Sequence, residues 1–270
     1  MSSLSQYAEK YENIRFERQD GVLQITLHTN GGPLAFSDQL HHDLGFAFYD
    51  VAADPETRVV ILTGTGDRFC AHFDYGSFMR SIGAHGREGP LRIRTDGRRM
   101  LAAFLDIEVP VISAINGPAV SHPELPVLAD VVLAAEHTIL QDPMHFPSGA
   151  VPGDGTHTVW TGLLGLNRGR YFLMTGQILT ATDARDLGVV GEVLPADDLL
   201  PRAWEIARHW ARLPRSSLVA TRQALTYEWK RLFLQQLHNG LTEEILAMAL
   251  MPPSEGPSGM PEVIDLLAGR

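Results

Sequence analysis

The chain has 270 residues, a formal net charge of −10 and a hydrophobic content of 44%. This size and composition fit one large α/β domain, or a core with an appendage, that buries a substantial apolar interior. The acidic balance excludes nucleic acid and anionic membranes as expected partners, because both attract clustered Lys and Arg. Cys70 is the single cysteine, so no intrachain disulfide is expected. No apolar run reaches the length of a signal peptide or a bilayer span, which predicts a cytoplasmic protein.

The first third of the chain predicts strand, helix and strand. Residues 22–28 alternate between apolar and polar side chains, as in a strand with one apolar face. Ser37 is a good N-cap for a helix whose apolar stripe includes Leu40, Leu44 and Phe48. The β-branched run 58–63 is typical of a parallel strand buried on both faces.

The middle of the chain alternates between irregular and regular segments. The Gly-rich and Arg-rich segment 81–97 has little periodicity and predicts a long loop. A helix is expected over about 98–105, followed by strands at 109–115 and 130–135. Strand, turn and helix recur up to about residue 195, which favours parallel crossover units.

The composition changes after Pro195, where two mostly helical stretches are expected, at 197–213 and 216–251. Residues 252–259 are rich in Pro, Ser and Gly and predict a linker or loop. We therefore expect an α/β core over residues 1–195 and a helical C-terminal region over residues 196–270.

Residues 116–155 hold the candidate chemistry. Three Gly- and Pro-rich turns follow short apolar runs there, and loops that follow buried strands are where scaffolds commonly present reactive groups. These turns contain His122, His145 and Asp154. Imidazole suits proton transfer near neutral pH, and a carboxylate can hold one ring nitrogen and so fix the tautomer.

Four spaced motifs resemble the crotonase (enoyl-CoA hydratase/isomerase) superfamily, in the right order. They are Thr63-Gly64-x-Gly66-x-x-Phe69-Cys70-Ala71-x-x-Asp74, Asn116-Gly117-x-Ala119 after Pro110-Val111-Ile112, Pro152-Gly153-x-Gly155, and Thr175-Gly176 to Gly188-Val189-Val190. The resemblance implies a spiral of ββα units. It also implies a helical C-terminal region that mediates oligomerisation, as a homo-oligomer that is a trimer or a dimer of trimers.

The departures from the hydratase pattern bear on function. Ser121-His122-Pro123 replaces the usual Gly-Gly-Gly run, Leu125 falls at the first hydratase glutamate, and His145 falls at the second. The set His122, His145, Asp154 and Glu244 is more similar to 6-oxocamphor hydrolase and related β-diketone hydrolases. Those crotonase-fold enzymes cleave a C–C bond by a retro-Claisen reaction.

Such a reaction needs an activated water, an oxyanion site and an enolate leaving group. We expect His145 to take the proton of water while Asp154 orients its ring and stabilises the imidazolium. His122 falls where the family uses a backbone amide for oxyanion binding, and its imidazole can donate to the carbonyl that becomes the enolate. The resemblance places Glu244 at the family's catalytic glutamate, where it would position water or assist proton return. The alternative is that Glu244 is a solvated acid on a helix.

The remaining assignments complete the expected site. Phe36, His41 and Phe78 fall where the similar hydrolases line an apolar substrate pocket. The alternative for the two phenylalanines is a place in the core, and for His41 a partly exposed position on a helix. His122, His145 and His157 together raise a metal site as an alternative. Their spacing is looser than that of zinc ligands, so no metal and no cofactor are expected.

The sequence thus predicts a cofactor-independent hydrolase of a small cyclic β-diketone that produces a keto acid. Two alternatives stay open: a CoA-dependent enoyl-CoA hydratase or isomerase, and a non-catalytic scaffold with the same fold. Leu125 and the Ser121-His122-Pro123 replacement count against the CoA-dependent alternative.

Overall fold

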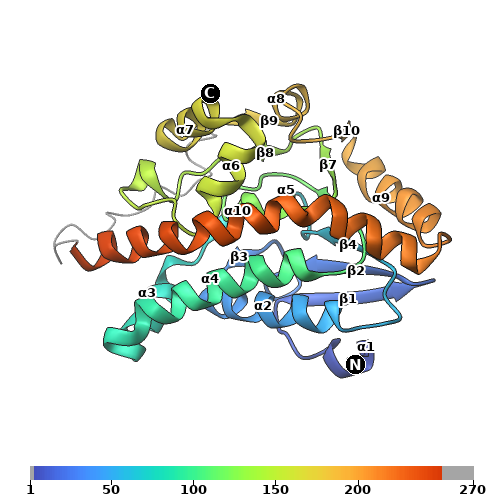
Figure 1. The fold of residues 1–270 in the computed structure, drawn as a ribbon, viewed down its shortest axis with the longest axis horizontal. Coiled ribbons are helices and arrows are strands. Elements are labelled where there is room, and N and C mark those ends of the chain that lie inside the picture. The colour runs from blue at the N-terminus through green and yellow to red at the C-terminus, as the bar shows by residue number, and fades with distance from the viewer. Residues whose placement is uncertain (1–2, 251–270) are drawn as a thin grey trace.

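The computed structural model describes residues 3–250, and its centre is a six-stranded sheet with the order β1-β2-β4-β6-β7-β10 (Figure 1). The strands are β1 (Ile14–Gln19), β2 (Val22–Leu27), β4 (Val59–Thr63), β6 (Val111–Ile115), β7 (Val131–Ala135) and β10 (Glu192–Leu194). β1 pairs antiparallel with β2, and every later pairing in this sheet is parallel. The parallel crossovers expected from the sequence are confirmed, whereas β1 was not expected.

Two small sheets lie at the edge of the core. They join β3 (Ala35–Phe36) to β5 (His72–Phe73) and β8 (Ile139–Leu140) to β9 (Leu179–Thr180). The helices are α1 (Leu4–Tyr7), α2 (Asp38–Ala52), α3 (Tyr75–His85), α4 (Gly89–Asp106), α5 (Glu124–Val127), α6 (Thr156–Leu164), α7 (Leu166–Thr175), α8 (Ala181–Asp186), α9 (Ala196–Trp210) and α10 (Arg215–Leu250), with 3-10 turns η1 (Gly86–Glu88) and η2 (Phe146–Ser148).

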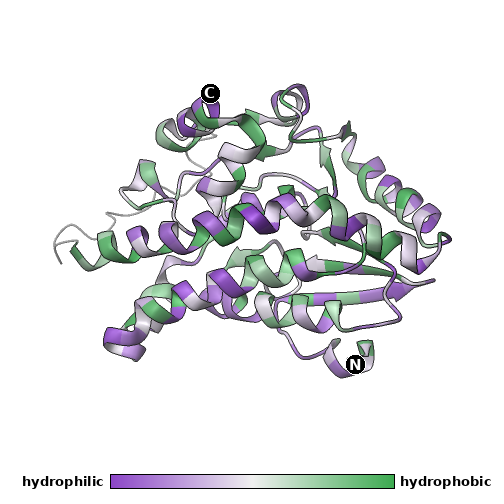
Figure 2. Ribbon diagram, in the orientation of Figure 1, coloured by the Kyte–Doolittle hydropathy of each residue, from purple (hydrophilic) through white to green (hydrophobic). Residues whose placement is uncertain are grey.

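The central strands are buried on both faces and mostly hydrophobic, which explains their β-branched sequences (Figure 2). Leu23, Ile25 and Leu27 of β2 join the larger core on the side of α2 and α4. Alternate side chains of the neighbouring strands, such as Val59 and Ile61 of β4, pack with α9 on the opposite face. Helices therefore cover both faces of the parallel sheet and exclude water from it.

The helix expected after Ser37 is confirmed, since the Ser37 hydroxyl accepts from the Leu40 N–H at the start of α2. The two C-terminal helices are also confirmed, as α9 and α10. Residue 251 and the expected loop 252–259 lie outside the described residues. Among residues 3–250, no helix combines the length and the apolar character that a bilayer crossing requires.

The loop expected at 81–97 is wrong. The segment forms the end of α3, the turn η1 and the first half of α4. Two of its glycines serve helix packing: a Cβ at Gly89 would come within 2.7 Å of the Ile82 backbone, and one at Gly97 within 3.1 Å of His41 Nε2. A glycine-rich composition is typical of loops, but here glycines lie where two helices approach closely. Pro90 is tolerated because it lies in the first turn of α4.

α10 is attached to the core through a buried arginine. Arg222 donates from Nε to the Ile107 carbonyl at 2.6 Å and from Nη2 to the Phe104 carbonyl at 3.1 Å, and its Nη1 pairs with Asp130. The side chain is fully buried, and these contacts join α10 to the end of α4 and the start of β7. The helix runs beside α4 across the molecule (Figure 1).

Replacing Arg222 with Met should destabilise the protein by about 3–5 kcal/mol, because Asp130 is left as an uncompensated buried charge. Urea unfolding measures the loss. Arg231→Met is the matched control, since Arg231 lies on the exposed side of the same helix and pairs with Glu228. Equal stability of the two variants would contradict a structural role for the Arg222–Asp130 pair.

Candidate active site

His122 lies after β6, His145 and Asp154 lie after β7 and the short strand β8 that follows it, and Glu244 lies on α10. β6 and β7 are parallel neighbours, so the segments that follow them leave the same edge of the sheet. Asn116 braces this edge: its side chain accepts from the Gly64 N–H at 3.0 Å and donates to the carbonyls of Gly66 and Arg68. At Gly117 φ is +151°, and a Cβ there would lie 1.9 Å from the Asp67 carbonyl oxygen. The Asn-Gly motif thus holds two loops together.

His145 is held between two carboxylates. Its Nδ1 lies 2.8 Å from Asp142 Oδ1, and its Nε2 lies 3.3 Å from Asp154 Oδ2. The sequence placed Asp154 behind the ring as the orienting acid. In the structure Asp142, which is fully buried, holds the nitrogen remote from Asp154. Asp154 instead faces the nitrogen that remains for proton exchange.

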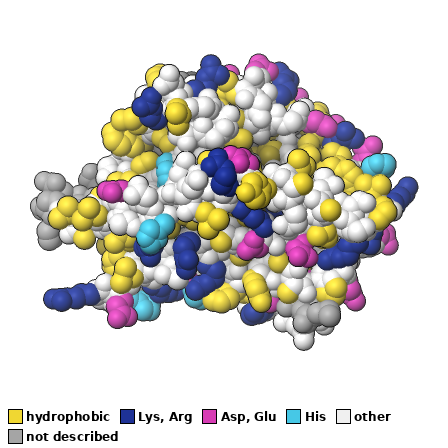
Figure 3. All heavy atoms as spheres, viewed as in Figure 1, with side chains coloured by type: hydrophobic (Ala, Val, Ile, Leu, Met, Phe, Trp, Pro, Cys, Tyr) yellow, Lys and Arg dark blue, Asp and Glu magenta, His cyan; other side chains and the backbone are white. Residues whose placement is uncertain are grey.

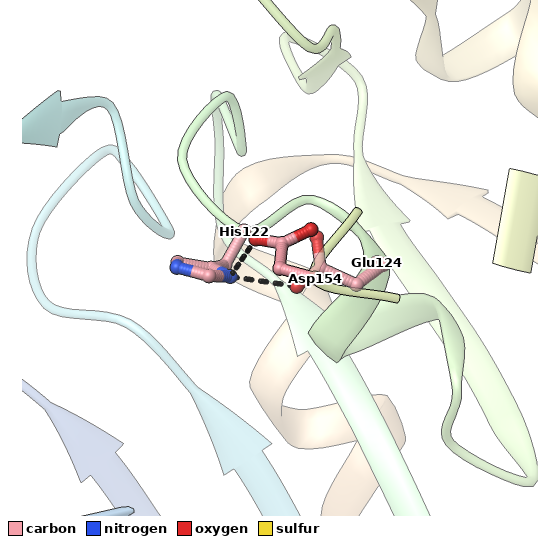
Figure 4. A group of neighbouring side chains, drawn as sticks. All are labelled: His122, Glu124 and Asp154. Atoms are coloured by element: carbon pink, nitrogen blue, oxygen red, sulfur yellow. Dashed lines mark hydrogen bonds and ion pairs between the residues drawn. The ribbon is translucent and has the colours of Figure 1, made fainter. Parts of the chain in front are cut away.

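His122 has a carboxylate of its own. Its Nδ1 donates to Glu124 Oε1 at 2.7 Å and lies 3.5 Å from Asp154 Oδ2, while the other ring nitrogen points away from both acids (Figure 4). The backbone of His122 is left-handed, with φ at +48°, which is uncommon for a non-glycine residue. Strain of this kind concentrates at functional sites, where it aims a side chain.

The electrostatics favour a charged cluster. Burial opposes protonation of His145, but Asp142 and Asp154 outweigh it and raise its pKa well above the usual value. At His122 burial also lowers the pKa, but Glu124 and Asp154 outweigh it and raise the pKa above the usual value. Burial alone would raise the pKa of Asp154, yet the two imidazoles hold it low. Both histidines therefore favour the imidazolium form beside ionised acids.

Glu244 approaches this cluster from α10 because two backbones pack closely. A Cβ at Gly153 would lie 2.2 Å from the Gly240 carbonyl oxygen, and one at Gly240 would lie 2.2 Å from His157. Among the described residues, Oε2 of Glu244 is buried without a hydrogen-bond partner. Burial, with the charge of Asp154 adding to it, raises the pKa of Glu244 to about 8. Glu244 is accordingly a neutral acid at neutral pH.

The expected pocket residues lie beside His122. The Phe36 ring is 4.2 Å from the His122 ring, and the His41 ring is 5.5 Å from it. Phe78 is 5.6 Å from His41, and Phe73, which the sequence did not suggest, stacks on Phe78 at 4.6 Å. Burial, together with the charge of His122, lowers the pKa of His41 to about 3, so this imidazole is neutral. The wall is aromatic and uncharged.

Three side chains have the spacing of a metal site. Donor atoms of His122, Glu124 and Asp154 lie within 4.8 Å of one another. His157, the third histidine of the metal alternative, is engaged elsewhere, since its Nδ1 lies 2.8 Å from the Pro152 carbonyl. The three donors already hydrogen-bond within the protein, which gives each of them a function that needs no ion.

Two acids of the site were missed by the sequence analysis. Glu124 directly precedes Leu125, and the sequence comparison with the hydratases aligned their first glutamate with Leu125 and assigned no role to Glu124. Asp142 lies three residues before His145, a spacing that lets the two side chains meet within one turn. A carboxylate close in sequence to each candidate histidine was the available signal.

The enoyl-CoA hydratase/isomerase family model matches residues 17–244, so the chain belongs to this family and the expected crotonase fold is confirmed. A carnitinyl-CoA dehydratase of Salmonella arizonae is 31% identical over 198 residues, covering 73% of this chain and 74% of that protein. A solved β-diketone hydrolase from Anabaena sp., bound to (S)-3-oxocyclohexyl acetic acid, is 45% identical with a TM-score of 0.86 and covers 90% of this chain and 96% of that one. A solved enoyl-CoA hydratase/isomerase from Mycobacterium paratuberculosis is 27% identical with a TM-score of 0.80, covering 87% and 93%.

Glu244→Gln should stabilise the protein in a pH-dependent way. The unfolded chain ionises Glu244 above the ordinary glutamate pKa of 4.5, while the folded chain keeps the proton up to a pKa of about 8. This group therefore costs stability that grows as the pH rises through that window. Thermal unfolding at about pH 5 and about pH 8 should show the larger gain in Tm at the higher pH.

Glu243→Gln is the matched control, because Glu243 is exposed on the same turn of α10. Parallel pH dependence of Glu244→Gln and the wild-type protein would mean that Glu244 is not kept neutral.

Proposed function

We propose that the protein hydrolyses a C–C bond of a small, apolar, cyclic 1,3-diketone to a keto acid without a cofactor. The observation that carries this proposal is the pairing of two buried imidazoles with separate carboxylates around Asp154, beside an aromatic wall. The proposal has three parts: a base for water, a donor for the developing enolate, and a pocket that suits an uncharged ring.

His145 is the proposed base. Asp142 fixes a proton on Nδ1, which leaves Nε2 as the nitrogen that can accept a proton. Water bridging Nε2 and Asp154 Oδ2 would lose its proton to Nε2 as its oxygen bonds to a substrate carbonyl carbon. Because the two acids raise the pKa of His145, the neutral imidazole becomes more populated as the pH rises. The rate should therefore increase with pH on its acidic limb.

His122 is the proposed donor. When the C–C bond breaks, its electron pair passes into the second carbonyl and forms an enolate. The imidazolium of His122, held by Glu124 at Nδ1, can donate from Nε2 to the enolate oxygen. The proton taken from water then returns to the enolate carbon, so the opened ring carries a carboxylic acid at one end and a ketone at the other, which is the keto acid. Glu244, as a neutral acid, can hydrogen-bond to the attacking water or to the nascent carboxylate.

The pocket favours an uncharged cyclic substrate. Phe36 lies beside the His122 ring, Phe73 and Phe78 stack with Phe36 and with each other, and neutral His41 adds no charge. Ala71, Val120 and Met144 form a small apolar cluster that packs against Phe73. A 1,3-diketone needs only this apolar contact and one or two donors, whereas a CoA thioester also needs groups for its phosphates. The 45% identical β-diketone hydrolase supports the same substrate class.

Enoyl-CoA hydration or isomerisation is the second candidate, because the family model and the carnitinyl-CoA dehydratase carry CoA activities in their names. Against it stands the chemistry at the positions of the two hydratase glutamates. Leu125 is buried in the apolar core and cannot exchange a proton, and His145 places an imidazole where a hydratase has its second glutamate carboxylate. Calorimetry with acetyl-CoA separates the candidates, since tight binding would favour the second.

A homo-oligomer, as a trimer or a dimer of trimers, is part of the proposal. Hydrophobic side chains lie along the outer side of α10 in the space-filling view (Figure 3). The exposed apolar residues of this helix include Leu225, Tyr227, Leu234, Leu246 and Leu250. Contact with another copy of the chain would remove such side chains from water. Sedimentation velocity of the purified protein measures the assembly.

The purified protein should consume at least one member of a panel of cyclic 1,3-diketones, detected as loss of substrate and appearance of acid. His145→Ala should lower kcat about 10²- to 10⁴-fold, because the base is removed. His209→Ala is the control, as His209 is exposed on α9. Reactions run with and without a chelator should have equal rates, because no proposed step uses a metal. An inert wild-type protein across the panel would refute the proposed function.

Asp142→Asn should lower kcat about 10²- to 10⁴-fold with little change in KM, because the imidazolium loses its supporting charge. The acidic limb of the pH–rate profile should also move to lower pH, since Asp142 raises the pKa of His145. Asp186→Asn, at an exposed aspartate, is the control. If the limb stays in place, Asp142 does not hold the base.

A further inference from the structure

Thr156 lies where the two carboxylate–imidazole pairs meet. It is the first residue of α6, and its side chain is completely buried. Its Oγ1 lies 2.9 Å from Asp154 Oδ1 and 3.1 Å from Glu124 Oε2. Asp154 contacts His145 through its other oxygen, and Glu124 contacts His122 through its other oxygen. One hydroxyl therefore connects both imidazoles through their acids.

A threonine hydroxyl has one proton to donate, and both neighbours are acceptors when ionised. The hydroxyl can donate to one carboxylate at a time. The nearby oxygen of the other carboxylate then faces a lone pair of Thr156 Oγ1 at hydrogen-bond distance. Because all three side chains are buried, no bulk water compensates this mismatch. The direction of the hydroxyl must then follow whichever carboxylate carries the less compensated charge.

We propose that Thr156 is a positioning residue whose hydroxyl turns between Asp154 and Glu124 as charge moves from one imidazole to the other. The inference rests on the proposed function. Before water is attacked, Asp154 must keep its position beside a neutral His145, and it receives the Thr156 proton. Once His145 is protonated, it compensates Asp154. As His122 shares its proton with the enolate oxygen, Glu124 is less compensated and attracts the hydroxyl.

The hydroxyl rotation forms and breaks hydrogen bonds only. No proton leaves Oγ1, and no co-reactant is needed. A methyl in its place would keep the shape of the side chain but remove the one hydroxyl proton that Asp154 Oδ1 and Glu124 Oε2 share, leaving Asp154 Oδ1 only the longer contact of 3.4 Å from the Thr156 N–H. Loss of the hydroxyl should destabilise the charge-separated states of the reaction and leave substrate binding unchanged. Thr156 contacts the two acids and does not contact Phe36 or Phe78.

The test compares Thr156→Val, which removes the hydroxyl at constant shape, with Thr156→Ser, which keeps it. Thr156→Val should lower kcat about 10- to 100-fold, the effect of one hydrogen bond to a charged group, and leave KM nearly unchanged. Thr156→Ser should recover most of the loss. Thr158→Val is the matched control, since Thr158 is equally buried on the same helix and its hydroxyl contacts His157 instead of the acids.

A double-mutant cycle adds a readout of coupling. If the hydroxyl serves both acids, Thr156→Val and Glu124→Gln should be less than additive in kcat, because each disrupts the same connection. Wild-type kcat in Thr156→Val, an equal loss in Thr156→Ser, or strict additivity with Glu124→Gln would each overturn the proposal. Failure of the wild-type protein to cleave any diketone would instead overturn the proposed function, so the two outcomes are distinguishable.

Discussion

Asp154 between two imidazoles is the contact on which the rest of the site depends. Its Oδ2 lies 3.3 Å from His145 Nε2 and 3.5 Å from His122 Nδ1. A single buried carboxylate stabilises two positive charges that burial would otherwise remove. Each imidazole then needs a second acid to hold its ring in place, and Asp142 and Glu124 provide these. The site is thus a closed set of charges whose members depend on one another.

The same fold supports different acid–base sets. In this chain the turns after β6 and β8 present histidines where the hydratase pattern has a glycine run and a glutamate. Placing imidazoles at these two positions changes which states are charged in a buried site, and therefore which reactions the scaffold favours. The aromatic wall around His122 completes this change, because it removes polar partners from the side where a substrate would lie.

Much of the fold could be predicted from the sequence, because buried parallel strands have a distinctive composition. The β-branched run at β4 and the N-cap at Ser37 specified their elements directly. Segment 81–97 could not be predicted, since glycines that permit close helix packing look like loop residues until the facing helix is known. β1 was missed for another reason: it is a short edge strand in which only Ile14 and Phe16 are buried, so its alternation covers too few apolar residues to stand out.

Some residues of the site could be predicted from the sequence and others could not. His122, His145 and Asp154 stood out because they occupy Gly- and Pro-rich turns, and the structure brings these three together. Glu124 and Asp142 did not stand out, because their importance comes from distances to rings that only the folded chain defines. Which ring nitrogen faces which acid is likewise a property of backbone conformation, as the left-handed φ of His122 demonstrates.

Gly153 and Gly240 affect how this site can diverge in evolution. Neither has a reactive group, yet their backbones touch so closely that any side chain would separate α10 from the Asp154 turn and withdraw Glu244. Divergence in chemistry can therefore begin at two chemically silent positions, and a survey that compares only acids and bases among relatives would miss the event.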